Sequence, residues 1–194
     1  MHTGEENTLS GLLNDVSQAA RNEDVSVQDV RSKLGDRAIT PFILLLAVLL
    51  VSPLSGIPGM PTVSAFLIVT MAVQALSGRR RLWLPRFLLR RKIAGKKLRR
   101  ALDWLERPCA FLDKHSQQRL EFLTRGIMRV VTLFICVFIP LGWPFLEVLP
   151  FVTSVGAGTI ALMVYGLFTR DGVYVFLGYL MVGLTVGGAI LLWT

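Results

Sequence analysis

The sequence predicts an all-α fold, a polytopic bundle of membrane helices, and three observations support this prediction. Two long apolar stretches, residues 40–76 and 130–168, are each interrupted near the middle by prolines and glycines. A strongly basic segment, residues 79–129, lies between them. The chain is 53% hydrophobic yet carries a net charge of +8, which indicates apolar segments in lipid and charges in water. Since a helix satisfies its own backbone groups where water is absent, each stretch is predicted to form a helical hairpin.

Residues 1–38 are predicted to form two short amphipathic helices in the cytosol. The first has apolar residues at helical spacing, at Leu9, Leu12, Leu13, Val16 and Ala20. The second begins at Ser26, which forms a capping-box pattern with Asp29, and ends at Gly35. Covering the membrane domain is the preferred interpretation of these helices, and docking of a partner is the alternative. This segment has no apolar core with a cleavage site, so no secretory signal peptide is expected.

The first membrane hairpin is predicted over residues 39–78, with arms at about 39–52 and 62–77. Each arm would span roughly 21–24 Å, less than the roughly 30 Å hydrocarbon core. The connector holds three prolines that break regular helix, at Pro53, Pro58 and Pro61. Two models remain open: two short spans that meet at the far interface, or a re-entrant hairpin shielded by protein.

The second hairpin is predicted over residues 130–169, with arms at about 130–140 and 151–168. Its helix breaks are assigned to Pro140, Pro144 and Pro150. Prolines bracket both connectors in a similar way, which indicates a weak internal repeat about 90 residues apart. Repeats with broken helices are common in transporters, but they also arise from duplication of a stable unit.

A C-terminal transmembrane helix is predicted over residues 173–194. Gly183 and Gly187 form a small-xxx-small pattern that permits close helix contact. Packing within the bundle is the preferred role of this pair, and a homodimer contact is the alternative.

The basic segment, residues 79–129, contains sixteen Lys and Arg against four acids and supplies the positive charge of the chain. Aromatic and leucine side chains alternate with its cations, which suits the lipid headgroup layer. The predicted anionic-lipid-binding residues are Arg79, Arg80, Arg81, Arg86, Arg90, Arg91 and Lys92. By the positive-inside rule this segment and the N-terminus are cytoplasmic.

Two other roles are compatible with the clustered cations of the basic segment. Nucleic-acid binding also needs clustered cations, but the position beside a membrane span argues against it. A site for the phosphates of a lipid carrier stays open. Residues 102–124 are predicted to form a cytosolic or interfacial helix that Pro108 starts or kinks.

No catalytic pattern is present, so the chain is predicted not to be an enzyme and to need no metal or cofactor. His2 and His115 are far apart, and the HExxH, CxxC and Walker motifs are absent. Cys109 and Cys136 are expected to be small packing residues rather than a disulfide or reactive thiols.

Three ionisable residues are candidate functional residues: Glu147, Arg170 and Asp171. Glu147 would be buried and functional if its connector were re-entrant, whereas at the interface it would be hydrated, which is preferred. Arg170 and Asp171 are adjacent at a helix end and are expected to form a capped turn.

The order of these features resembles the exopolysaccharide-synthesis ExoD family of bacterial membrane proteins. The supporting motifs are GIPGMP at 56–61, ALSGRRRLWLP at 75–85, RLEFLT at 119–124 and TRDG at 169–172. The resemblance implies an inner-membrane protein linked to exopolysaccharide production, and it brings no agreed activity. The broken hairpins also resemble DedA-type lipid-carrier translocases, by architecture only.

The expected function is a non-enzymatic accessory role in exopolysaccharide synthesis or export, through contact with anionic lipid, the exopolysaccharide machinery or other partner proteins. The alternative is a small transporter or lipid-carrier translocase that uses the two broken hairpins. Deep connectors around a polar cavity would favour transport, and a dry, closed bundle would favour the accessory role.

Overall fold

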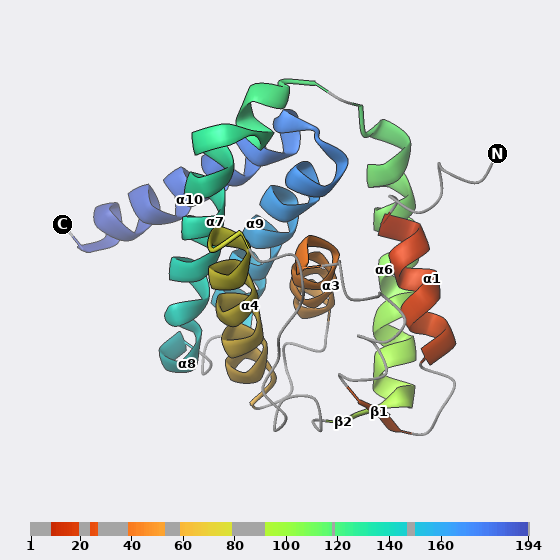
Figure 1. The fold of residues 1–194 in the computed structure, drawn as a ribbon. Helices are drawn as coiled ribbons and strands as arrows, with labels where there is room; N and C mark the ends of the chain where they lie inside the picture. Colours follow the sequence, from red (N-terminus) through yellow and green to blue (C-terminus); the bar gives the residue numbers. More distant parts are fainter. Residues whose placement is uncertain are drawn as a thin grey trace.

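The computed structural model describes residues 9–19, 24–26, 39–52, 59–78, 92–117, 119–146 and 150–193. Within these ranges the protein is a bundle of helices, as predicted (Figure 1). The elements in chain order are α1 (Leu9–Ala19), β1 (Asp24–Ser26), α3 (Ile39–Val51), α4 (Met60–Leu76), β2 (Lys92–Ala94), α6 (Gly95–His115), η2 (Glu121–Thr124), α7 (Gly126–Leu141), α8 (Trp143–Leu146), α9 (Pro150–Thr169) and α10 (Gly172–Trp193).

The arms of both predicted hairpins are helices with nearly the predicted bounds. The first hairpin consists of α3 and α4, and the second consists of α7 and α9. The second connector contains the one-turn helix α8, which the sequence did not indicate. Residues 53–58 and 147–149 lie outside the described part of the chain, so the depth of the two connectors stays open.

The predicted proline breaks that are described lie at helix ends. Pro61 is the second residue of α4, Pro144 is the second residue of α8, and Pro150 begins α9. Proline suits these first-turn positions because the missing N–H would have no partner inside the helix. Pro140 lies inside α7, one residue before its end. Pro53 and Pro58 lie outside the described residues.

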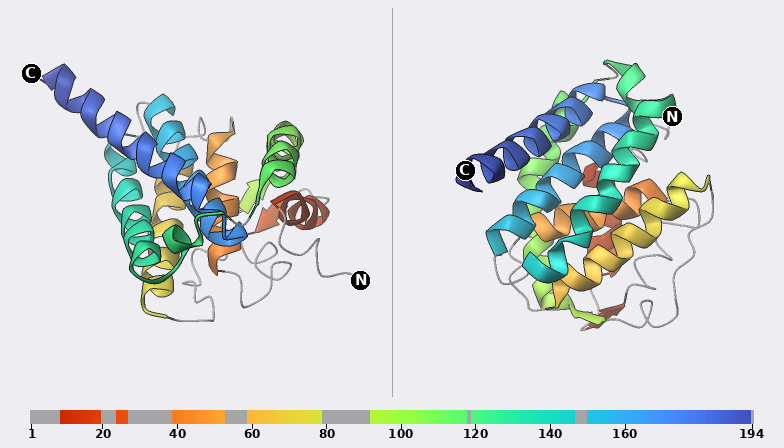
Figure 2. Two further views of the ribbon diagram at one scale, coloured as in Figure 1. Left: turned by 90° about the horizontal axis from the view of Figure 1, so that it is seen from above. Right: turned by 90° about the vertical axis from the view of Figure 1, so that its left-hand side faces the viewer.

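Helix α3 lies at the centre of the bundle because it is apolar on every side. Nine of its thirteen residues are buried: Ile39, Phe42, Ile43, Leu44, Leu45, Ala47, Val48, Leu49 and Leu50. It contacts α4 and α9 on one side and α1 and α6 on the other. Figures 1 and 2 show this order, with α1 and α6 side by side at one edge of the bundle. Helix α1 therefore packs mainly on α6, with a smaller contact to α3.

Helix α6 decides between the two roles predicted for Pro108. The helix extends from Gly95 to His115 with Pro108 inside it, so Pro108 does not start a helix, and the predicted kink stays open. The loss of one backbone hydrogen bond is tolerated in a helix whose buried face packs against α1 and α3.

A small antiparallel ribbon, β1 with β2, is an addition to the predicted all-α fold. Asp24 pairs with Ala94, and Ser26 pairs with Lys92. Ser26, the predicted start of the second N-terminal helix, is the last residue of β1. The rest of that helix lies in residues 27–38, outside the described part.

Close helix contacts occur at glycines in the second half of the chain. A Cβ atom at Gly156 would lie 3.0 Å from Trp143 Nε1, and one at Gly166 would lie 2.7 Å from the carbonyl oxygen of Asp171. At Gly183 and Gly187, by contrast, a Cβ atom would meet nothing within 4 Å. Among the described residues, this pair therefore has no neighbour within that distance for the preferred packing inside the bundle. The alternative homodimer contact stays a prediction.

Candidate functional site

A polar junction lies where α1, α6, α9 and α10 meet, and Asp113 is its central residue. Its two carboxylate oxygens accept hydrogen bonds from the backbone N–H groups of Leu9 (2.9 Å) and Ser10 (2.8 Å). They also accept bonds from Ser10 Oγ (2.6 Å) and Tyr165 Oη (3.1 Å). One carboxylate therefore caps the N-terminus of α1 and ties it to α9.

Helix dipoles explain the location of Asp113. It lies in the last turn of α6, where the negative end of that helix disfavours an acid. The N-terminal turn of α1 supplies unpaired N–H groups and the positive end of a second dipole. The N–H groups in the first turn of α1 need acceptors, and the carboxylate of Asp113 needs donors from outside α6. The junction satisfies both.

Two tyrosines pack beside this carboxylate. The rings of Tyr165 and Tyr174 meet edge to face, with centroids 4.9 Å apart and planes at 84°. Tyr174 Oη donates to the carbonyl oxygen of Leu112 at 3.3 Å. The end of α6 is therefore fastened to both α9 and α10.

Arg170 and Asp171 form the capped turn that was predicted. Arg170 adopts a left-handed conformation, with φ of 60°, and ends α9. Asp171 is 2% exposed, and its Oδ1 accepts the N–H of Val173 at 3.1 Å in the first turn of α10. Its Oδ2 accepts the N–H of Gln117 at 2.9 Å, which links this turn to the segment that follows α6.

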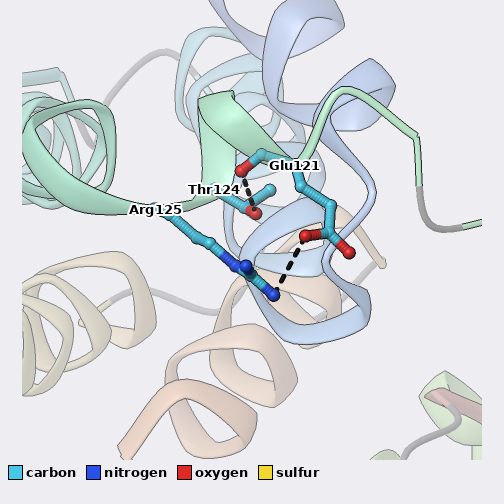
Figure 3. A network of polar contacts seen from close by, with 3 residues as sticks. All are labelled: Glu121, Thr124 and Arg125. Atoms are coloured by element: carbon cyan, nitrogen blue, oxygen red, sulfur yellow. Dashed lines mark hydrogen bonds and ion pairs between the residues drawn. The ribbon is translucent and has the colours of Figure 1, made fainter.

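The segment before α7 is held by short-range contacts, which Figure 3 shows. Arg125 pairs with Glu121 at 2.9 Å, and Thr124 Oγ1 donates to the carbonyl oxygen of Glu121 at 2.8 Å. Both members of the ion pair are partly exposed, so the pair contributes little to stability. It orders the turn between η2 and α7.

The junction is built to hold helices together. In the part of the chain that the structure describes, every buried side-chain nitrogen and oxygen has a hydrogen-bond partner, and no group of three metal-ligating side chains occurs. The Asp113 oxygens are fully used in capping and in the bond to Tyr165. Burial, with a smaller effect of Asp113, raises the pKa of the Cys109 thiol to about 12.

Both cysteines are free and buried, in agreement with the predicted packing role. At neutral pH the thiol of Cys109 is protonated and therefore a poor nucleophile.

The remaining predicted site residues do not gather at this junction. Arg79, Arg80, Arg81, Arg86, Arg90, Arg91 and Glu147 lie outside the described residues. Lys92 is the first residue of β2, and Pro61, Pro140, Pro144 and Pro150 are distributed over the ends of four helices. Only Asp171, of the predicted candidates, contributes to the junction.

The sequence patterns do not single out Asp113 or Tyr165 as site residues. Asp113 is one of the four acids of the basic segment. Its position near the C-terminal end of a predicted helix was the available signal, because an acid there requires donors from elsewhere. No sequence pattern marked Tyr165, which lies in a continuous apolar run.

The outer surface of the bundle differs between its two edges. Large apolar side chains are exposed on α4, α7 and α10, for example Phe66, Phe138 and Leu184. Charged side chains are exposed on α6, for example Arg99 and Glu106. Among the described helices, one segment, Val152–Thr169 of α9, is long and apolar enough to cross a membrane, with a mean hydropathy of 1.5. Helices α3, α4, α7 and the described part of α10 are apolar but shorter.

The fold and the junction define an all-helical protein with one membrane-capable helix and an apolar outer face. A family model described as "Exopolysaccharide synthesis, ExoD" matches residues 9–191. The chain therefore belongs to the ExoD family, which is linked to exopolysaccharide synthesis, as the resemblance of its motifs indicated. It is 28% identical over 192 residues to Protein ExoD of Rhizobium meliloti (strain 1021), across 95% of this chain and 77% of that protein. No solved structure matches it.

Proposed function

We propose that this protein is a non-enzymatic accessory protein of exopolysaccharide synthesis or export, embedded in the bacterial inner membrane. Membership of the ExoD family supports the process. The exposed apolar side chains of α4, α7 and α10 support contact with lipid, because soluble proteins rarely expose large continuous apolar patches.

The dry centre of the bundle is the observation that favours an accessory role over transport. The central helix α3 is surrounded by apolar side chains. Among the described residues, Thr159 Oγ1 donates to the carbonyl oxygen of Val155 in its own helix. Thr132 Oγ1 bonds to the carbonyl oxygen of Met128 in its own helix and to Tyr179 Oη of α10. Such hydroxyls do not line a polar path, which a translocated headgroup would need.

The basic segment is proposed to hold the cytoplasmic side of the protein at the membrane or at a partner subunit. Its cations Arg79, Arg80 and Arg81 follow α4 directly and would meet anionic headgroups there. The N-terminal helix α1 would then be cytoplasmic as well. In this arrangement the protein acts through contacts and not through a reaction.

A lipid-carrier translocase is the second candidate, and the packing of the hairpins favours it. The first arm of each hairpin packs on the second arm of the other, α3 on α9 and α7 on α4. A two-fold internal repeat predicts this exchange of partners, and such repeats are typical of transporters.

Deletion of the gene in its native bacterium, followed by complementation with variants, distinguishes the accessory role from the translocase. Deletion should lower secreted polysaccharide, and the wild-type gene should restore it. The accessory role predicts that Glu147→Gln also restores it, whereas glutamine at Arg79, Arg80, Arg81, Arg86, Arg90, Arg91 and Lys92 together does not. A control carries glutamine at four other cations of the segment, Lys114, Arg119, Arg125 and Arg129, and should restore production.

Loss of polysaccharide in Glu147→Gln, at a normal protein level in the membrane, would contradict the accessory role. That result would favour the translocase, and reconstituted flipping of a labelled lipid carrier would then be expected.

A further inference from the structure

An apolar groove of about 320 Å³ lies between α6 and the rest of the bundle. Trp104 and Pro108 of α6 form one wall, and Val51 of α3, Gly158 and Ala161 of α9 form the other. Met181 of α10 also lines it. Leu9 and Tyr165, which belong to the polar junction, line it as well, but Tyr165 Oη is bonded to Asp113. The groove is therefore lined by apolar atoms and adjoins the polar junction.

The groove is open because two of the side chains that α9 contributes to it are small. Gly158 and Ala161 lie where larger residues would fill the groove, and a Cβ atom at Gly158 would meet only Val51 Cγ2, at 3.8 Å. Protein interiors are otherwise packed with few voids larger than a water molecule. An open apolar space of this volume lies at the lower end of the range for ligand sites, and hydrocarbon is the chemistry that its walls fit.

The charges around the groove are all on α6. Arg100 and Arg107 lie one helical turn on either side of Trp104, so these three exposed side chains share one face of the helix. The described parts of α3, α9 and α10 have no charged residue within their helices. The acids Asp103 and Glu106 line a different cavity, which α6 forms with Ser10 and Asn14 of α1. Arg100 and Arg107 thus lie on either side of the exposed Trp104, which lines the groove, and Asp113 bonds to the lining residues Leu9 and Tyr165.

We propose that this groove binds one hydrocarbon chain of an anionic membrane lipid, with the lipid phosphate held by Arg100 and Arg107. An apolar tail and a negative headgroup match the apolar walls and the two guanidinium groups, which bind phosphate through paired N–H donors. The inference rests on the proposed membrane location and adds a defined lipid site, apart from the basic residues 79–92. It implies that α6 is held on the bundle partly by a bound lipid.

Photocrosslinking of the full-length protein in phosphatidylcholine nanodiscs tests this site. Three probes carry a diazirine in the acyl chain: phosphatidylglycerol, phosphatidylcholine and diacylglycerol. Mass spectrometry of the peptides compares adducts on residues 104–112 of α6 with adducts on the exposed faces of α7 and α10. The proposal predicts adducts on α6 at least fivefold more abundant with phosphatidylglycerol than with either other probe.

Matched substitutions examine the two parts of the site. Gly158→Leu or Ala161→Leu should fill the groove and lower the α6 adducts at least fivefold. Gly183→Leu, on the open face of α10, should leave them unchanged. Arg100→Gln with Arg107→Gln should remove the preference for phosphatidylglycerol, whereas Arg99→Gln, on another face of α6, should keep it. Circular dichroism and gel filtration identify any variant that does not fold.

Four outcomes overturn the proposal. Equal α6 adducts with all three probes would show that the arginines do not select an anionic headgroup. Unchanged α6 adducts in both groove-filling variants would show that the acyl chain does not bind in the groove. Adducts on α7 and α10 without any on α6 would exclude a lipid in the groove while the membrane location stands. Absence of adducts on every helix would contradict the membrane location itself.

Discussion

Asp113 shows how one side chain connects two parts of this chain. Its carboxylate accepts two backbone N–H groups from α1, one on each oxygen, together with the hydroxyls of Ser10 and Tyr165. Hydrogen bonds to a charged acceptor are roughly twice as strong as those between neutral groups. A residue 104 positions from Leu9 in the sequence thereby supplies the cap that α1 lacks among its own described residues.

Replacement of Asp113 by asparagine should therefore destabilise the attachment of α1. The amide nitrogen cannot accept the N–H that one carboxylate oxygen now accepts, and the expected loss is about 2 kcal/mol. Thermal unfolding of the purified protein should show a lower midpoint for Asp113→Asn. Asp103→Asn is the matched control, because Asp103 is exposed on the same helix, and its midpoint should match that of the wild type. Equal midpoints for all three proteins would contradict the capping role.

At the scale of elements, the bundle depends on a few close approaches between helices. Helix α10 turns back on α9 at Gly166, where a Cβ atom would lie 2.6 Å from Val175 Cγ2 and 2.8 Å from the backbone nitrogen of Val175. Real Cβ contacts with backbone do not occur at such distances, so the two helices would have to separate. The Arg170 to Asp171 turn, capped at the start of α10, fixes the same approach.

Gly166→Ala should separate α9 from α10 at this turn and destabilise the protein by about 1–3 kcal/mol, the usual cost of overpacking. Gly183→Ala should not change the thermal midpoint, because a Cβ atom there meets open space. If Gly183 serves a homodimer, this second variant should lower the dimer fraction in crosslinking or sedimentation without changing monomer stability. An unchanged midpoint for Gly166→Ala would show that the two helices do not pack as described.

The helices could be predicted because their apolar runs are long and their ends are marked. Prolines and glycines bound α4 and α9 in the sequence, and the apolar spacing from Leu9 to Val16 marks α1. The polar junction could not be predicted, because it joins Ser10, Asp113 and Tyr165 through tertiary packing. The apolar groove could not be predicted from the sequence either, because it arises where Gly158 and Ala161 have too little side-chain volume to fill the space.

The whole molecule has two unlike edges. Helices α1 and α6 form one edge (Figure 2). Helix α6 exposes charged residues there together with Trp104 and Phe111, and both helices bury leucines. Helices α4, α7 and α10 expose phenylalanine, leucine and valine at the other edge. A bundle that lies in a bilayer would place the second edge in lipid and the first against water, headgroups or a partner. This division accounts for a mean hydropathy of +0.56 together with a net charge of +8.

Spin labels on the two edges test this central claim most directly. In a variant without Cys109 and Cys136, single cysteines replace Phe138 of α7, Leu184 of α10 or Glu106 of α6, and each carries a nitroxide in reconstituted vesicles. The account predicts that labels at 138 and 184 collide mainly with oxygen, which concentrates in lipid, and that the label at 106 collides mainly with a water-soluble nickel complex. Preferential collision with nickel at all three positions would contradict a membrane-embedded bundle.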